Sequence, residues 1–172
     1  NKVASVNDVD GAGVYLSGAN LTMQENSKIS SNSCVFGGHA SSYGGGVYIN
    51  NSSTFTMTSG VISENSAEYG GGVYVSGGTF KMNGGSISNN TVTDYGSGVY
   101  VVKNTDSTGK VSSPTFEISG NACIIGDNDV YLTAEQKITI TGELSSDTVA
   151  TITPENYEEN VDAPVLATDN GI

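Results

Sequence analysis

The most regular pattern in this chain is a short unit in which apolar and polar residues alternate between clusters of Gly, Ser and Asn. Residues 70–90 show it best, with runs at 73–75 (Val-Tyr-Val), 80–82 (Phe-Lys-Met) and 86–88 (Ser-Ile-Ser). Alternation with a period of two is typical of a half-buried β-strand, and the Gly and Asn residues between the runs indicate tight bends. We therefore expect three short strands in each unit.

The unit recurs along most of the chain, at separations of 33, 26, 26 and 31 residues. The first strand of each copy starts with valine, at Val14, Val47, Val73, Val99 and Val130. The second strand recurs at 21–23, 55–57, 80–82, 116–118 and 138–140, and the third around Ile29, Ile62, Ile87, Leu144 and, less clearly, 123–125. A repeat of this size is typical of a solenoid, in which each coil buries its inner face only by stacking on the next.

The predicted fold is all-β, a right-handed single-stranded parallel β-helix of about five coils with three short strands each. The coils start near residues 11, 44, 70, 96 and 129. Right-handedness is expected because crossovers between parallel strands almost always have this hand. Two coils exceed 26 residues, and we assign the surplus to a projecting loop at 33–42 and a polar loop at 103–114.

Two domains are expected, a parallel β-helix at 1–148 and a C-terminal cap or linker at 149–172. The second stretch is acidic, holds two of the three prolines and lacks the Gly-Val-Tyr start. Residues 1–10 look like the end of a preceding coil. We therefore expect the chain to be a piece of a longer protein, with flanking domains on the same chain.

Alternate residues of a strand face opposite sides, which assigns each position to the interior or the surface. The inner columns are all Val, then Leu/Phe/Phe/Phe/Ile, then Met/Met/Met/Ile/Ile. Outside, Lys81 and Glu117 should form an ion pair. Equivalent bends carry Asn32, Asn65, Asn90 and Asp147, of which the three asparagines could stack as an amide ladder.

One tyrosine of each first strand should point outward, and together they form the candidate ligand-binding column: Tyr15, Tyr48, Tyr74, Tyr100 and Tyr131. Regularly spaced aromatic faces can stack on sugar rings or on a partner protein. The alternative is that they stack only on each other or beneath a neighbouring domain. Tyr43, Tyr69 and Tyr95, which end three coils, should form a second stack.

Composition disfavours several functions. The chain has 18 acidic residues, six lysines, no arginine and a net charge of −12, which disfavours binding to nucleic acid. No apolar run reaches 18 residues, so no direct membrane insertion is expected. Cys34 and Cys123 lie three coils apart, roughly 14 Å at about 4.8 Å per coil, and are expected to be free thiols.

A motif from Ile62 to Val73, Ile-Ser-Glu-Asn-Ser-Ala-Glu-Tyr-Gly-Gly-Gly-Val, recurs at 87–99 and more loosely from Ile29. It is similar to the paired FxxN and GGA[ILV] motifs of the polymorphic outer membrane protein repeats of bacterial surface and autotransporter proteins. Here Ile stands in place of Phe, and Gly in place of Ala. The resemblance covers residues 11–147 and implies an adhesin-like β-helix on the bacterial cell surface, or secreted, with no catalytic residue.

The predicted function is therefore a non-enzymatic extracellular stalk or binding surface, with a glycan or a host or partner protein as ligand. The rival is a polysaccharide lyase or glycoside hydrolase-like module, whose candidate acids are Asp106, Asp127 and Asp129. The single histidine, His39, is read as a solvated loop residue. No calcium loop or nonapeptide calcium repeat is present, so no cofactor is expected, with calcium at Asp127, at Asp129 or at the acidic cluster from Glu155 to Asp162 left open.

Overall fold

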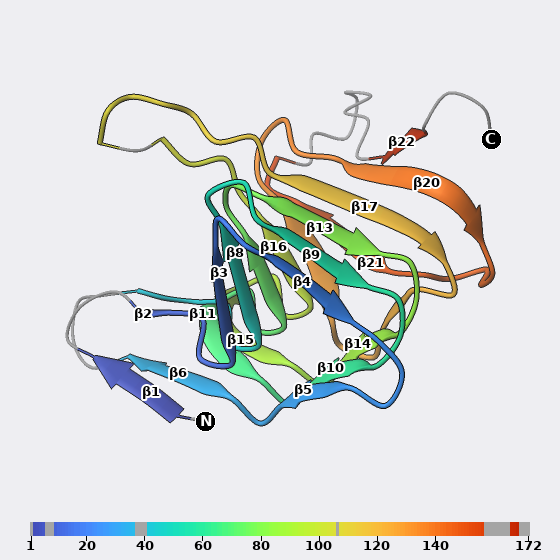
Figure 1. Ribbon diagram of the computed structural model, residues 1–172, viewed down its shortest axis with the longest axis horizontal. Helices are drawn as coiled ribbons and strands as arrows, with labels where there is room; N and C mark the ends of the chain where they lie inside the picture. Colours follow the sequence, from blue (N-terminus) through green and yellow to red (C-terminus); the bar gives the residue numbers. More distant parts are fainter. Residues whose placement is uncertain (1, 6–8, 37–40, 106, 157–165, 169–172) are drawn as a thin grey trace.

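The computed structural model describes residues 2–5, 9–36, 41–105, 107–156 and 166–168, and these form strands, turns and bends without an α-helix. The chain winds as a parallel β-helix, in which successive coils add parallel strands to the same sheets (Figure 1). The predicted fold class is therefore confirmed. In the described part of the chain, no helix has the length and apolar character needed to cross a membrane.

Two sheets of six parallel strands carry the first and second strands of the coils. The Val-Tyr sheet consists, in sequence order, of β3 (Val14–Ser17), β8 (Val47–Asn50), β12 (Val73–Val75), β16 (Val99–Val101), β19 (Asp129–Leu132) and β21 (Thr151–Pro154). The Phe-Met sheet consists of β4 (Asn20–Met23), β9 (Thr54–Met57), β13 (Thr79–Met82), β17 (Thr115–Gly120), β20 (Ile138–Leu144) and β22 (Leu166–Thr168).

A third sheet, the Ile sheet, contains the predicted third strands of four coils. It consists of β5 (Lys28–Ser30), β10 (Val61–Ser63), β14 (Ser86–Ser88) and β18 (Cys123–Ile125). The pairing puts Ile29, Ile62, Ile87 and Ile124 at equivalent positions. Coil four, where the sequence signal is weak, thus has its third strand at 123–125.

A fourth sheet is not predicted from the sequence. It adds two strands to coil one and one strand each to coils two and three, and it includes two strands that precede coil one. Its strands are β1 (Lys2–Ser5), β2 (Val9–Asp10), β6 (Ser33–Phe36), β7 (Ser42–Tyr43), β11 (Ser66–Tyr69) and β15 (Thr91–Tyr95). In β11 (SAEY) and β15 (TVTDY) the apolar positions are occupied by Ala67 and Val92 and by tyrosines, between Ser, Thr and acidic residues, so their apolar signal is weaker than that of the Val-Tyr and Phe-Met strands. They pair because the coils on which they lie are already in register.

The projecting loop expected at 33–42 is largely part of this fourth sheet. β6 pairs with β1 and β11, and β7 pairs with β2 and β11. Residues 37–40, which include His39, lie outside the described residues. The described residues of the second predicted loop, 103–105 and 107–114, do lie outside the sheets and extend away from them at the upper left of Figure 1.

The interior is a stack of identical or similar side chains. Val73 is paired with Val47 and Val99, and all three are 0% exposed. The rings of Phe55, Phe80 and Phe116 stack with centroid distances of 5.3 and 5.0 Å. The predicted inner columns are therefore confirmed. On the outer face of the Phe-Met sheet, the Lys81 ammonium lies 2.9 Å from the Glu117 carboxylate, which confirms that ion pair.

The end of coil five differs from the sequence expectation. Leu144 does not form a strand of the Ile sheet, because it ends β20 and pairs with Gly120 of β17 across an irregularity in register. Val149 lies beside β18 instead, and its carbonyl accepts a hydrogen bond from the Ile124 amide at 2.7 Å. β21 and β22 then form the sixth strand of the Val-Tyr sheet and of the Phe-Met sheet, beside β19 and β20 respectively.

Two glycines show why the corner before β12 requires this residue. Gly70 has φ of +64°, a left-handed conformation that a side chain disfavours. A Cβ on Gly72 would lie 2.5 Å from the Gly98 carbonyl oxygen and 3.1 Å from Asn90 Nδ2. The neighbouring coil and a buried asparagine thus approach too closely for any other residue.

Replacement of Phe80 by alanine tests the shared core. Phe80 is fully buried between two other phenylalanine rings, so Phe80→Ala should lower the free energy of unfolding by about 3–5 kcal/mol. Urea denaturation followed by circular dichroism measures this loss. The matched control is Lys81→Ala on the outer face of the same strand, which should change stability by no more than about 1 kcal/mol. Equal effects of the two substitutions would contradict the assignment of inside and outside.

Candidate functional site

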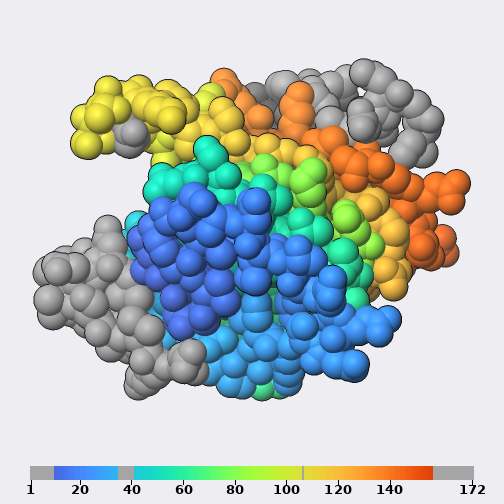
Figure 2. Space-filling view, viewed as in Figure 1, coloured from blue at the N-terminus to red at the C-terminus, as the bar shows by residue number. Residues whose placement is uncertain are grey.

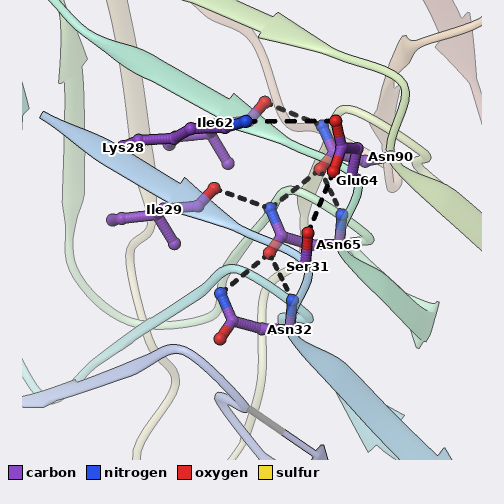
Figure 3. A network of polar contacts seen from close by, with 8 residues as sticks. All are labelled: Lys28, Ile29, Ser31, Asn32, Ile62, Glu64, Asn65 and Asn90. Carbon is purple, nitrogen blue, oxygen red and sulfur yellow. Dashed lines mark hydrogen bonds and ion pairs between the residues drawn. The ribbon is translucent and has the colours of Figure 1, made fainter. Parts of the chain in front are cut away.

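A row of buried asparagines follows the bend between the Ile sheet and the fourth sheet (Figure 3). The Asn32 side chain donates from Nδ2 to Asn65 Oδ1 at 2.9 Å, and Asn65 donates to Asn90 Oδ1 at 2.9 Å. The same Oδ1 atoms accept the backbone amides of Asn32 and Asn65 at 3.1 and 3.0 Å. The predicted amide ladder is therefore confirmed for these three residues.

The fourth member of the ladder is Asn128, and the prediction of an equivalent position at Asp147 was wrong. Asn90 donates from Nδ2 to Asn128 Oδ1 at 2.9 Å, whereas Asp147 is exposed after β20. Asn128 follows Ile124 by four residues instead of three, so a fixed spacing misses it. The available signal was that Asn128 is the only asparagine between Ile124 and the next coil start at Val130.

The side-chain amides of Asn65 and Asn90 use both amide hydrogens and accept two hydrogen bonds each. Asn65 Nδ2 also donates to the Ile29 carbonyl at 3.0 Å, and Asn90 Nδ2 to the Ile62 carbonyl at 3.1 Å. Among the described residues, every buried side-chain nitrogen and oxygen has a partner. A fully satisfied polar row of this kind fixes the register of the coils, and its role here is structural.

The surface of this bend carries charged and hydroxyl side chains. Glu64 has φ of +58°, immediately before Asn65, and its carboxylate accepts a hydrogen bond from Ser31 Oγ at 2.9 Å. The Lys28 ammonium lies 3.9 Å from the same carboxylate, and both side chains are more than half exposed. These contacts are solvated, so they contribute little to stability.

The five candidate tyrosines form a single stacked column on the outer face of the Val-Tyr sheet. Consecutive ring centroids along it are 5.2, 5.1, 5.3 and 5.2 Å apart, with interplanar angles of 13°, 10°, 2° and 2°. The register of the strands explains this spacing, because equivalent residues in parallel strands lie directly beside one another. The predicted column therefore exists.

A second column, formed by Tyr43, Tyr69 and Tyr95, packs against the first. Tyr43 lies 4.9 Å from Tyr74 and Tyr69 lies 5.6 Å from Tyr100 between ring centroids. Tyr95 stacks on Tyr131 at 4.5 Å. The sequence predicts the second stack, but it gives no indication that this stack would cover the first.

This covering decides how much of the candidate column a ligand could reach. Tyr48, Tyr74 and Tyr131 are buried, at 6%, 5% and 8% exposure, and Tyr100 is half-buried. Tyr15 is 46% exposed, and Tyr95 of the second column is 49% exposed. The tyrosines therefore serve to pack the outer face, and a ligand-binding role for the column remains a prediction.

Burial in the two columns changes the acid–base behaviour of the phenols. It raises the pKa of Tyr48 to about 12, although a hydrogen bond with Ser76 partly opposes the shift. Burial also raises the pKa of Tyr69 to about 12, and the negative charges of Asp94 and Glu68 add to the effect. Burial raises the pKa of Tyr74, Tyr100 and Tyr131 as well.

Of the three candidate acids, two lie in the described part of the chain. Asp129 Oδ1 accepts hydrogen bonds from the Ser97 amide at 2.8 Å and from Ser97 Oγ at 2.9 Å, so this carboxylate ties coil five to coil four. Asp127 is exposed, and its backbone carbonyl accepts a bond from Ser97 Oγ. Asp106 lies outside the described residues.

The remaining candidates for chemistry are the two cysteines and a metal site. Cys34 and Cys123 are free thiols, as predicted, and burial raises the pKa of Cys34 to about 11. A thiol with such a pKa is a poor nucleophile near neutral pH. Over the described ranges, no group of three or more His, Cys, Asp or Glu residues is placed to hold a metal ion.

Comparisons with protein-family models, with curated proteins and with solved structures give no match to this chain.

A change of Asn65 to aspartate tests the ladder. Asn65→Asp removes the amide donor and turns a carboxyl group toward the Asn90 and Ile29 oxygens, so stability at pH 7 should fall by about 1–3 kcal/mol. The introduced carboxyl is buried near other oxygens, which raises its pKa in the folded state. The loss should therefore shrink below about pH 4, where this carboxyl is protonated in the unfolded chain too.

Thermal unfolding at pH 3.5 and pH 7 measures this dependence. Asn121→Asp, on an exposed bend, is the matched control and should behave like the parent chain at both pH values. A similar loss of stability in both variants would argue against a special role for the buried row.

Alkaline titration tests the tyrosine columns. In the folded protein, Tyr48 and Tyr69 should remain largely protonated at pH 11, whereas tyrosines of the unfolded chain ionise near pH 10. Because the unfolded chain loses protons first, the stability of the fold should decrease as the pH rises above about 10. Phenolate absorbance in buffer and in concentrated urea measures the difference, and Tyr48→Phe should remove one late-titrating group. Identical titration curves in the two solvents would contradict the buried packing.

Proposed function

We propose that this chain is a non-enzymatic segment of a larger bacterial surface protein, which acts as a rigid extracellular stalk that carries a binding surface. The observation that supports this most is the unbroken pairing of equivalent residues in the Val-Tyr sheet, from β3 to β21. Six strands at roughly 4.8 Å spacing extend about 24 Å along the axis. Such a rod holds its two ends at a fixed separation, as a stalk requires.

The occupation of the conspicuous polar groups also supports a non-enzymatic role. The buried asparagines bond to one another, the Asp129 carboxylate bonds to Ser97, and the tyrosine rings stack on tyrosine rings. Each of these groups contributes to the stacking of coils. An adhesin-like surface segment needs this rigidity and needs no acid or base with a shifted pKa.

The rival function, cleavage of polysaccharides, makes a different prediction. We expect no release of reducing ends or unsaturated products when the purified chain is incubated with a panel of neutral and acidic polysaccharides. A glycan array and a parallel activity screen measure binding and turnover on the same sample. Cleavage that disappears in Asp127→Ala, but persists in Asp147→Ala, would overturn the proposal, because both residues are exposed aspartates.

A further inference from the structure

The polar segment of coil four forms one wall of a groove on the solenoid. We call residues 102–105 and 107–113 the arm. Between the arm and the bends after β8 and β12 lies an open groove of about 480 Å³. Figure 2 shows the arm, in yellow, overhanging the bend of coil two, in teal. The arm thus reaches back across coil three, which forms the floor.

Hydrogen bonds within the arm fix the shape of this wall. The Asn104 amide donates to Ser112 Oγ at 2.8 Å, and the Ser112 amide donates to the Asn104 carbonyl at 2.7 Å. Thr105 and Val111 form an antiparallel bridge beyond them. The Val102 amide donates to the Val75 carbonyl at 3.0 Å, which joins the arm to coil three.

The groove exists because the bend of coil three lacks side chains where its neighbours have them. Gly77 lies on the floor, and a Cβ there would be 2.8 Å from Asn50 Oδ1 on one wall and 3.5 Å from Ser112 Cβ on the other. Its backbone does not need the left-handed conformation. Glycine at this position therefore keeps the groove open, beyond any need for an unusual turn.

The opposite wall holds two consecutive residues in an unfavourable backbone conformation. Asn51 and Ser52 have φ of +49° and +59°, which costs of order 1–3 kcal/mol for each residue. Hydrogen bonds hold this bend, from the Asn51 amide to Asn50 Oδ1 at 2.8 Å and from the Ser52 amide to the Gly77 carbonyl at 2.7 Å. The strained bend presents Asn50, Asn51 and Ser52 side by side on the groove wall.

Hydroxyl groups of the first tyrosine column are hydrogen-bonded to residues that line this groove. Tyr48 OH and Ser76 Oγ are 3.1 Å apart, and the Tyr74 hydroxyl is hydrogen-bonded to the Asn104 side chain. Ser76 and Asn104 both line the groove. The buried tyrosines therefore position two of the polar groups that a ligand in the groove would meet.

The chemistry of the lining residues selects a class of ligand. Those that the structure describes are amides, hydroxyls, a glycine and a valine, with Lys110 as the only charged side chain among them. Amides and hydroxyls both donate and accept, which matches the hydroxyl groups of sugars. The chain as a whole carries a net charge of −12 and would repel a polyanion at long range.

We propose that this groove binds a neutral oligosaccharide, so that the arm and the bends of coils two and three form the binding surface of the stalk. The proposal rests on the non-enzymatic binding function given above. It places the ligand in the groove beside the tyrosine hydroxyl groups, instead of on the faces of the stacked tyrosine rings.

The test is a glycan array on the whole chain, followed by calorimetric titration with the best neutral oligosaccharide. Gly77→Val, which fills the floor, and Asn104→Ala, which removes one wall group, should each weaken binding at least about tenfold. Asn121→Ala, an exposed asparagine of a distant bend, is the control and should bind like the parent chain. Circular dichroism and thermal midpoints establish whether each variant is folded. If Gly77→Val does not fold, the binding of Asn104→Ala alone tests the proposal.

The outcomes separate this proposal from the proposed function. Neutral glycan binding that both groove variants retain, or binding only to uronic or sialic acid glycans, would overturn the groove assignment and leave a non-enzymatic segment. Absence of binding to any glycan would overturn it too and leave a stalk alone. Glycan cleavage would overturn the proposed function itself.

Discussion

The structure depends on the pairing of each residue with its counterpart in the next coil. Val47, Val73 and Val99 are paired in succession, as are Tyr48, Tyr74 and Tyr100. Parallel pairing brings identical backbone groups to a fixed spacing, so any side chain that recurs at the same position meets its own kind. The phenylalanine stack, the tyrosine columns and the asparagine ladder are three consequences of this one constraint.

The asparagine ladder and the corner glycines enforce that pairing together. A buried amide that must both donate and accept allows only one alignment, because a shift by one residue leaves its donors and acceptors without partners. Gly46 and Gly72 lie close to the ladder, and a Cβ on either would come within 3.1 Å of the adjacent asparagine nitrogen. The interior therefore combines an apolar column, which provides the driving force, with a polar row that specifies register.

The outer surface follows the same rule with a different result. Where coils are of equal length, tyrosines from two positions interlock and leave few ring faces exposed. In coil four the extra residues have no counterpart to pair with and leave the solenoid as the arm, whereas the described surplus of coil one joins the fourth sheet. The proposed binding groove arises at this irregularity, beside a strained bend and a bare glycine. The repeated strands form the rigid framework, and the residues that depart from the repeat form the surface that differs from coil to coil.

The repeat determined much of this architecture from the sequence alone. Alternation of apolar and polar residues identified the Val-Tyr, Phe-Met and Ile strands, and equal spacing identified Asn32, Asn65 and Asn90 as stacked. These features are local and periodic, so they can be read without coordinates. A fixed residue spacing gave the wrong result in two places. One extra residue before Asn128 hid it as a ladder member, so Asp147 was predicted at an equivalent position instead, and at the end of coil five Leu144 continues β20 rather than forming a third strand.

Only the tertiary structure decided the features that join distant positions. The fourth sheet has only a weak apolar signal, such as Ala67 in β11 and Val92 in β15, and its strands pair once neighbouring coils are in register. Coverage of the tyrosine column depends on the tilt of Tyr43 and Tyr69 over the rings of Tyr74 and Tyr100, two coils further along. The groove requires the arm of coil four to fold back over a bend more than 50 residues earlier in the chain. Periodicity fixes which residues share a column, whereas the contacts between columns depend on side-chain size and on where the surplus residues fold.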